Sequence, residues 1–255
     1  MNVYAVERQS WLVEHARAEG RIDVNDVAQL LDVAPETVRR DLNTLERHGL
    51  VRRVHGGAVP VERLGFEGAL VTRATTRTEE KSQIARAALA HLDNVESIFL
   101  DEGTTAAAVA ELLEPQRPLT VVTSALPIAC RLAEQPNLTV MILGGRVRGH
   151  TLGAVDQWAT RMLEDLVIDL ALVGTNGITV AHGLTCPDSA VAAVKRRAIA
   201  SSRRAILLAD HSKFGADSSV RFADVRDIEM VVTDRGTPES ELRSLRRLGI
   251  EVVQA

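Results

Sequence analysis

The chain has 255 residues, of which 45% are hydrophobic and 25% charged, the composition of an ordinary globular protein with one large or two modest domains. It contains no apolar run of about 18 residues for a membrane span, and Glu7 and Arg8 stand where a secretory signal would need an apolar core, so we expect a cytoplasmic protein without a membrane partner. The formal net charge of -4 argues against non-specific coating of nucleic acid, so any affinity for DNA must come from individually placed contacts.

Metal and cofactor chemistry has little support in the sequence. Cys130 and Cys186 lie far apart and form no Cys-x-x-Cys pair, which argues against a disulfide framework and a zinc knuckle. The histidines are scattered without the spacing of metal ligands. We therefore expect no metal and no cofactor, and two buried thiols.

The first predicted elements form a helical DNA-reading unit. Between residues 24 and 31 the apolar positions have the spacing of a short amphipathic helix that packs on a longer helix before it. A second helix, beginning near Pro35, would bury Val38, Leu42 and Leu45 and expose its other side. The exposed positions that could reach a DNA groove are Pro35, Glu36, Thr37, Arg39, Arg40 and Asn43.

A short hairpin is predicted directly after this helix. Arg52, Arg53 and His55 precede Gly56-Gly57, in the position of a wing that touches the DNA backbone or minor groove. Five arginines face three acidic residues between residues 35 and 55, so positive charge is confined to this helix and hairpin. An arginine pair on a helix is often only a solvated surface, but the order of helix, turn, helix and hairpin favours DNA binding.

Beyond the hairpin the periodic pattern loosens and then becomes that of another fold. We place a DNA-binding domain at residues 1–58, a linker at 59–75 and a second domain at 76–255. Strand-like apolar runs then alternate with helical ones, which is typical of a parallel α/β sheet. The predicted strands cover residues 97–100, 119–122, 139–143, 170–173, 205–208, 230–232 and 251–253.

The loop Asp101-Glu102-Gly103-Thr104-Thr105 follows the first of these strands and precedes an alanine-rich helix at residues 105–113. Ligands of parallel sheets bind outside the carboxyl ends of the strands. Gly103 would let backbone amides approach an anion, the two threonines would supply hydroxyl groups, and the helix N-terminus would favour a phosphate. A capped strand-to-helix turn explains the same loop equally well when it is taken alone.

Several other predicted strands end in loops of the same kind. Gly144 and Gly145 can also be simple turn residues, Asn176 a cap and Lys213 an exposed loop lysine, but together these loops favour one ligand site. Asp188 and Lys195 lie two helical turns apart, a spacing that suits a pair around a sugar, and Asp210 can accept from hydroxyl groups while Lys213 balances a phosphate. The residues assigned to the effector site are Lys81, Asp101, Gly103, Thr104, Thr105, Ser124, Gly144, Gly145, Arg146, Asn176, Gly177, Asp188, Lys195, Asp210 and Lys213.

The motifs Thr-Val-Arg-Arg-Asp-Leu at residues 37–42, His-Gly-Gly-Ala at 55–58 and Leu-Ala-Asp-His-Ser-Lys-Phe-Gly at 208–215 resemble those of the DeoR family of bacterial transcriptional regulators. This resemblance covers nearly the whole chain. It implies a winged helix-turn-helix followed by a Rossmann-like α/β domain that is related to ribose-phosphate isomerases and binds phosphorylated sugars. Three positions depart from the family pattern, where Ala34 replaces a serine cap, Ser124 an asparagine and Asp188 a glutamate. Proline at the first helical position still suits a helix start.

The segment from His182 to Lys195 resembles most the actinobacterial branch that represses fructose uptake operons, which implies fructose 1-phosphate as the effector. We therefore expect a repressor whose partners are double-stranded operator DNA and a phosphorylated sugar. We also expect a dimer or tetramer, because one winged helix reads only a few base pairs. The alternative is a sugar-phosphate isomerase, in which Asp188, Lys195 and Asp210 would move protons.

Overall fold

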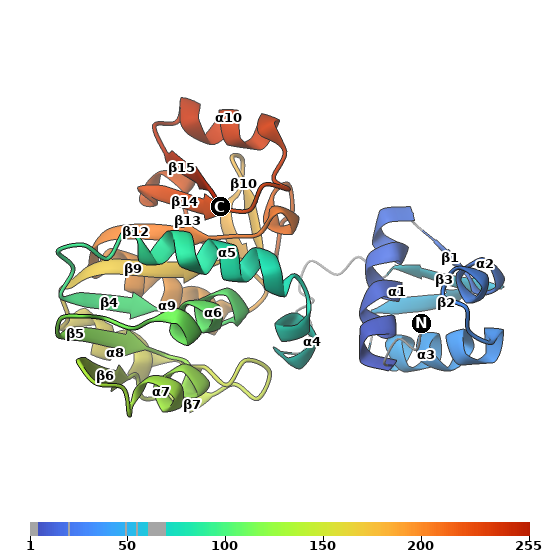
Figure 1. The fold of residues 1–255 in the computed structure, drawn as a ribbon, viewed down its shortest axis with the longest axis horizontal. Coiled ribbons are helices and arrows are strands. Elements are labelled where there is room, and N and C mark those ends of the chain that lie inside the picture. Colours follow the sequence, from blue (N-terminus) through green and yellow to red (C-terminus); the bar gives the residue numbers. More distant parts are fainter. Residues whose placement is uncertain (1–4, 20, 49, 55, 61–69) are drawn as a thin grey trace. The chain divides into compact units, whose positions relative to one another are not determined.

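The computed structural model describes residues 5–19, 21–48, 50–54, 56–60 and 70–255 (Figure 1). The chain divides into two compact units, residues 1–76 and 77–255. No helix in the described part of the chain combines the length and apolar composition that crossing a bilayer requires. Each unit has a hydrophobic core of its own.

In its described residues up to Pro60, the first unit contains three helices and a small antiparallel sheet. The helices are α1 (Ala5–Glu19), α2 (Val24–Leu30) and α3 (Pro35–Arg47), and the sheet has the order β1 (Ile22–Asp23), β3 (Gly57–Pro60), β2 (Val51–Val54). Asp23 caps α2 by accepting hydrogen bonds from the N–H groups of Asn25 and Asp26. Helix α3 has no side-chain cap at Ala34 and begins with proline, as the sequence predicts. This is the arrangement of a winged helix-turn-helix.

Close packing explains one glycine of the wing. A Cβ atom on Gly57 would lie 1.8 Å from the carbonyl oxygen of Ile22, because β3 pairs with β1 at this point. Strand β3 continues to Pro60, two residues beyond the predicted end of the DNA-binding domain, and helix α4 (Leu70–Thr75) occupies part of the predicted linker.

The second unit is built on a seven-stranded parallel sheet of order β15-β14-β12-β9-β4-β5-β6. Every predicted strand is present, within three residues of its predicted ends. The strands are β4 (Ser97–Leu100), β5 (Leu119–Thr123), β6 (Leu138–Ile142), β9 (Ile168–Gly174), β12 (Ser202–Leu208), β14 (Met230–Thr233) and β15 (Glu251–Gln254).

Helices cover both faces of this sheet (Figure 1). Along β4, Ile98 and Leu100 point to one face and pack with α5 (Thr78–Leu89), α6 (Thr104–Leu112) and α7 (Leu126–Leu132). Phe99 points to the other face and packs with residues of α8 (Gln157–Glu164), α9 (Ser189–Ala200) and α10 (Glu239–Arg247). This alternation follows from the two-residue period of a strand, and it produces the predicted Rossmann-like α/β layers.

Smaller elements follow the strand ends. The antiparallel strands β10 (Gly177–Thr179), β11 (Gly183–Cys186) and β13 (Val220–Ala223) form a separate sheet, and β7 (Arg146–Val147) pairs with β8 (Ala154–Val155). Two 3-10 turns cover His211–Lys213 and Val225–Asp227. Cys186 is buried as expected, but Cys130 is exposed on α7, so that part of the expectation is wrong.

Candidate functional site

Helix α3 exposes the side that the sequence assigns to DNA. Val38, Leu42 and Leu45 are buried in the core of the first unit. Arg39 Nη1 lies 3.1 Å from an oxygen of Glu36, but both side chains are exposed, so this ion pair contributes little and its arginine can exchange partners. The residues exposed on this helix include Pro35, Glu36, Arg39, Arg40 and Asn43, while Thr37 is half-buried.

Arg53, a wing residue that the sequence assigns to DNA, holds the wing against α3. Arg53 Nη1 donates to the carbonyl oxygen of Arg39 at 3.3 Å, and its backbone N–H donates to Glu46 Oε1 at 2.7 Å. Arg53 therefore orients the wing in this structure, whereas Arg52 points to solvent. His55 lies outside the described residues.

A buried carboxylate on the inner side of α3 was missed by the sequence analysis. Asp41 is 4% exposed and accepts from Arg8 Nε at 2.5 Å and Gln9 Nε2 at 2.8 Å, both on α1. Its spacing of three residues from Val38 places it among the core positions of α3, and this periodicity could have revealed it. Asp41 ties the recognition helix to the helix behind it.

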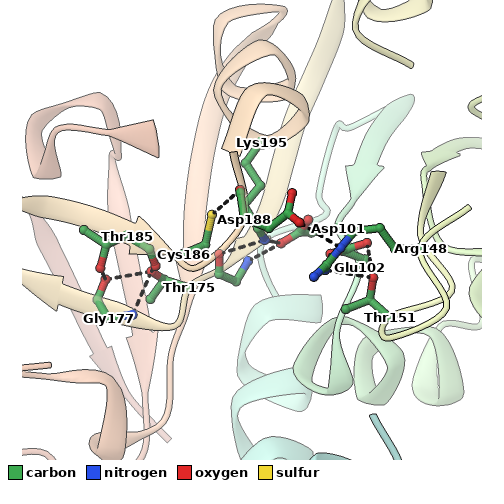
Figure 2. A network of polar contacts seen from close by, with 11 residues as sticks. Asp101, Glu102, Arg148, Thr151, Thr175, Gly177, Thr185, Cys186, Asp188 and Lys195 are labelled. Carbon is green, nitrogen blue, oxygen red and sulfur yellow. Dashed lines mark hydrogen bonds and ion pairs between the residues drawn. The ribbon is translucent and has the colours of Figure 1, made fainter. Parts of the chain in front are cut away.

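In the second unit, Asp101 and Lys195 form a buried ion pair beyond the ends of β4 and β9 (Figure 2). Lys195 Nζ also donates to the carbonyl oxygen of Gly174 at 3.1 Å, and the N–H of Gly174 donates to Asp101 Oδ2 at 2.8 Å. Burial alone would lower the pKa of Lys195, but the charges of Asp101 and Glu102 outweigh it, so this pKa is raised. The lysine therefore stays charged.

A second polar group adjoins this pair and contains Asp188, which the sequence analysis placed with Lys195 around a sugar. Asp188 caps α9 by accepting from the N–H groups of Ala190 and Val191, and its Oδ2 lies 3.2 Å from Arg148 Nε. Capping directs its carboxylate to the helix N-terminus, away from a residue two turns along the helix.

Arg148 and Glu102 are members of this group that the sequence analysis did not single out. Arg148 Nη1 lies 3.9 Å from Glu102 Oε1, and Glu102 Oε2 accepts from Thr151 Oγ1 at 2.9 Å. Glu102 stands inside the quoted loop motif, but Arg148 and Thr151 lie in a segment with no regular pattern. Only the fold brings that segment against the loop (Figure 2).

Three predicted effector residues line one packed gap that has no room for a water molecule. Asp101, Ser124 and Lys195 line it together with Glu102, and apolar residues of β8 and α9 close it. Asp101 is 1% exposed and Ser124 is also 1% exposed. The ends of β4 and β5 and one face of α9 therefore converge here, as the strand-end rule predicts.

The start of α6 adjoins this gap through Asp101 and Glu102. Gly103 has φ 117° and no side-chain cap, and a Cβ atom added there would meet nothing within 4 Å. Thr104 and Thr105 are half-buried in the first turn, which contains no acidic residue. The N–H groups of this turn and the two hydroxyl groups form a surface suited to an anion.

Asp210 belongs to a separate polar group beyond the ends of β12 and β14. Its Oδ1 accepts from the Ser212 N–H at 3.0 Å and lies 3.9 Å from Arg77 Nε, while His211 Nδ1 lies 2.7 Å from Asp234 Oδ2. Burial alone would raise the pKa of Asp210, but Lys213, Ser212 and Arg77 outweigh it and lower this pKa. Asp234 follows β14, so the strand-end rule that selected Asp210 could have found it.

The remaining predicted residues do not join one site. Gly144 and Gly145 are exposed, and a Cβ on Gly145 would lie 2.3 Å from the Val155 carbonyl oxygen, so this glycine serves the turn. Arg146 pairs with Asp156 along an open groove away from Asp101. Two further predictions concern half-buried Asn176, in the turn between β9 and β10, and buried Gly177, the first residue of β10.

Gly177 is closely packed on the side where a side chain would stand, and its contact with the effector stays a prediction. A Cβ atom there would lie 2.2 Å from the carbonyl oxygen of Ala216. Lys81 is buried on α5, one turn after Arg77, and its N–H donates to the Arg77 carbonyl oxygen at 3.1 Å. Lys81 thus stands on the element that begins at the Asp210 group.

Two family models match the chain. Residues 8–63 match the DeoR-like helix-turn-helix domain, and residues 76–235 match the DeoR C-terminal sensor domain. The chain belongs to the DeoR family. The regulator GlpR of Haloferax volcanii is 34% identical over 248 residues, which cover 97% of this chain and 96% of that protein.

A second relative matches nearly the whole chain, whereas a solved structure aligns with about half of it. The glycerol-3-phosphate regulon repressor of Escherichia coli K12 is 30% identical to this DeoR-family protein over 94% of both chains. Among solved structures, the ribose 5-phosphate isomerase A of Methanocaldococcus jannaschii aligns with a TM-score of 0.40 and 15% identity over 55% of each chain. The family consists of transcriptional regulators, so the isomerase alternative is wrong and the chain is not an enzyme.

Proposed function

We propose that this DeoR-family regulator represses genes of sugar uptake or catabolism. A phosphorylated sugar that binds in the second unit changes the affinity of the regulator for operator DNA. The observation that carries the sensor half of the proposal is the buried Asp101–Lys195 pair beside the uncapped N-terminus of α6. A charged pair supplies partners for hydroxyl groups, and a helix N-terminus supplies partners for a phosphate. Both chemistries occur at one end of the sheet.

The DNA-binding half of the proposal assigns specificity to α3 and backbone contact to the wing. Arg39, Arg40 and Asn43 are exposed and have side chains that can bond base edges in the major groove. We also assign DNA contacts to two further groups of residues. These are Pro35, Glu36 and Thr37 at the start of α3, and Arg52, Arg53 and His55 in the wing. Arg53 must exchange its contact with the Arg39 carbonyl oxygen to reach a phosphate.

The effector assigned by this proposal is fructose 1-phosphate, with the phosphate at Gly103, Thr104 and Thr105. The resemblance of residues 182–195 to fructose-operon repressors supports the choice of sugar. The glycerol-3-phosphate regulon repressor shows that a relative of similar length carries the name of another small phosphate ester. The protein would act in the cytoplasm as a dimer or tetramer, because paired half-sites require at least two reading helices.

The coupling between the two sites requires that the sugar phosphate bind the two DNA-binding states with different affinity. A hundredfold change in operator affinity corresponds to only about 2.7 kcal/mol of coupling. Operator fragments selected from random DNA, titrated with the full-length protein, should show weaker binding when fructose 1-phosphate is added and no change with fructose. An operator affinity that no sugar phosphate alters would contradict the sensor assignment.

Thr104 offers a variant that separates the two halves. Thr104→Val removes a hydroxyl group from the first turn of α6 without adding bulk. Operator affinity in the absence of sugar should stay unchanged, whereas the affinity for fructose 1-phosphate, measured by calorimetry, should fall about tenfold, the equivalent of one charge-assisted hydrogen bond. Thr160→Val on α8 is the control. Thr160 Oγ1 donates hydrogen bonds to the carbonyl oxygens of Asp156 and Gln157, at the start of its own helix.

A further inference from the structure

The two carboxylate oxygens of Asp101 have different surroundings. Oδ2 faces both Lys195 Nζ and the N–H of Gly174. Oδ1 is buried and has no hydrogen-bond partner among the described residues. The side chain is 1% exposed, so bulk water does not supply the missing donor.

The cost of this arrangement indicates that Oδ1 has a partner in another state of the protein. A buried acceptor left without a hydrogen bond destabilises the folded protein, and such groups in native structures have an explanation. The structural work of Asp101, which is to fix Lys195 and the end of β9, is complete with Oδ2 alone. The fold therefore explains the position of Oδ2 but does not supply a hydrogen-bond donor for Oδ1.

The chemistry of Oδ1 restricts its missing partner. An ionised carboxylate only accepts hydrogen bonds, so the partner must donate. A phosphate dianion is excluded at this position, because Asp101 and Glu102 are both buried acids and the phosphate would add a like charge. Lys195 already balances the charge of Asp101, so a neutral donor such as a hydroxyl group suffices.

We propose that Asp101 Oδ1 accepts a hydrogen bond from a hydroxyl group of the sugar, and so selects sugar phosphates by their hydroxyl pattern. This inference rests on the proposed function and deepens it. The sugar then spans from Asp101 to the start of α6, with its phosphate at the N–H groups beyond Gly103. A carboxylate at residue 101 thus binds one end of the ligand, and N–H groups beyond residue 103 of the same loop bind the other end.

The segment from Arg148 to Gly153 packs against Glu102, the neighbour of Asp101 in the loop. Arg148 lies between Glu102 and Asp188, and Thr151 Oγ1 donates to Glu102. The packed gap beside Asp101 is lined by Glu102 and by the start of β8, which follows this segment. A hexose phosphate reaches Asp101 when these contacts open, so the contacts of Arg148 exchange on binding.

Calorimetry with the full-length protein tests the assignment. The probes are fructose 1-phosphate, glucose 6-phosphate and glycerol 3-phosphate, followed by analogues of the tightest binder that each lack one hydroxyl group. The wild type should bind one analogue at least tenfold more weakly than its parent. In Asp101→Asn the parent should bind about tenfold more weakly, and the penalty for that same analogue should fall below threefold, while penalties for the other analogues stay unchanged.

Asp169→Asn is the matched control, because Asp169 is a hydrogen-bonded carboxylate at the other end of β9, where it accepts from Ser97. It should bind the parent within twofold of the wild type. If Asp101→Asn does not fold by circular dichroism, Asp101→Asn/Lys195→Met takes its place, since that double variant leaves no buried unpaired charge.

Two negative outcomes are distinguishable. If the wild type binds none of the three phosphate esters, the proposed sensor function fails and this inference with it. If a sugar phosphate binds but Asp101→Asn retains the wild-type penalty for every analogue, only the role of Asp101 Oδ1 is overturned. The same holds if no analogue costs the wild type more than threefold.

Discussion

Gly153 and Glu102 approach so closely that a Cβ atom on Gly153 would lie 1.6 Å from Glu102 Oε2 and 2.8 Å from its carboxyl carbon. Glu102 is buried and accepts from Thr151 Oγ1, so its carboxylate has little freedom to retreat. Glycine at position 153 is therefore required by the close packing of one loop on another. The two residues are 51 positions apart in the sequence, and only the folded chain brings them together.

Gly153→Ala should destabilise the protein by about 1–3 kcal/mol, the usual cost of forcing an added methyl group into a packed site. The free energy of unfolding from urea denaturation measures it. Gly149→Ala, in the same segment, is the matched control, because a Cβ atom there meets nothing within 4 Å. Glu102→Ala should rescue Gly153→Ala by removing the clash. Equal stability of the two glycine variants would contradict the packing argument.

Contacts between distant loops, such as this one, could not be predicted from the sequence. The seven strands were predictable because buried parallel strands read as short apolar runs, and Asp101 and Ser124 could be placed together from the rule that ligands bind at strand ends. Lys195 lies on α9 and was assigned from its spacing after Asp188 and from the family resemblance. The contacts of Arg148 were not predictable, because its segment has no period of its own. Helical spacing placed Asp188 and Lys195 around a sugar, which stays a prediction. The capping of α9 by Asp188 was not predicted, although its place before the first turn is that of a cap.

Asp41 should matter for stability although it faces away from the expected DNA surface. Asp41→Ala leaves Arg8 and Gln9 without their carboxylate, and we expect a loss of about 1–3 kcal/mol in the first unit. Trp11 on α1 provides a fluorescence signal for unfolding of this unit. Glu36→Ala, which removes an exposed pair from the same helix, should change stability by less than about 0.5 kcal/mol. A smaller loss of unfolding free energy in Asp41→Ala than in Glu36→Ala would contradict the stabilising role of the buried Asp41 carboxylate.

Arg40 should contribute to operator affinity, because its exposed side chain lies near the start of the reading helix. Arg40→Ala should weaken binding by about 1–3 kcal/mol if the arginine contacts a base, and relax the preference for one base pair. Fluorescence anisotropy at constant salt, on a selected operator and its single-base variants, measures both effects. Arg47→Ala, at the other end of the helix, should reduce affinity less and equally for all sequences. Unchanged affinity and base preference in Arg40→Ala would remove it from the interface.

The lowered pKa of Asp210 predicts the pH dependence of its contribution to stability. Because the folded-state pKa lies below the unfolded-state value of about 3.9, the stabilisation is complete above that value and is lost as the pH falls through the folded pKa. Urea denaturation of the wild type and Asp210→Asn should therefore give a constant difference in unfolding free energy from about pH 7 to 5, which shrinks below about pH 4. Lys213→Met removes the first group that lowers this pKa, so the stabilisation by Asp210 should be smaller than in the wild type, and its loss should be complete at a higher pH. A difference between wild type and Asp210→Asn that grows on acidification would show that the folded protein does not favour the ionised carboxylate.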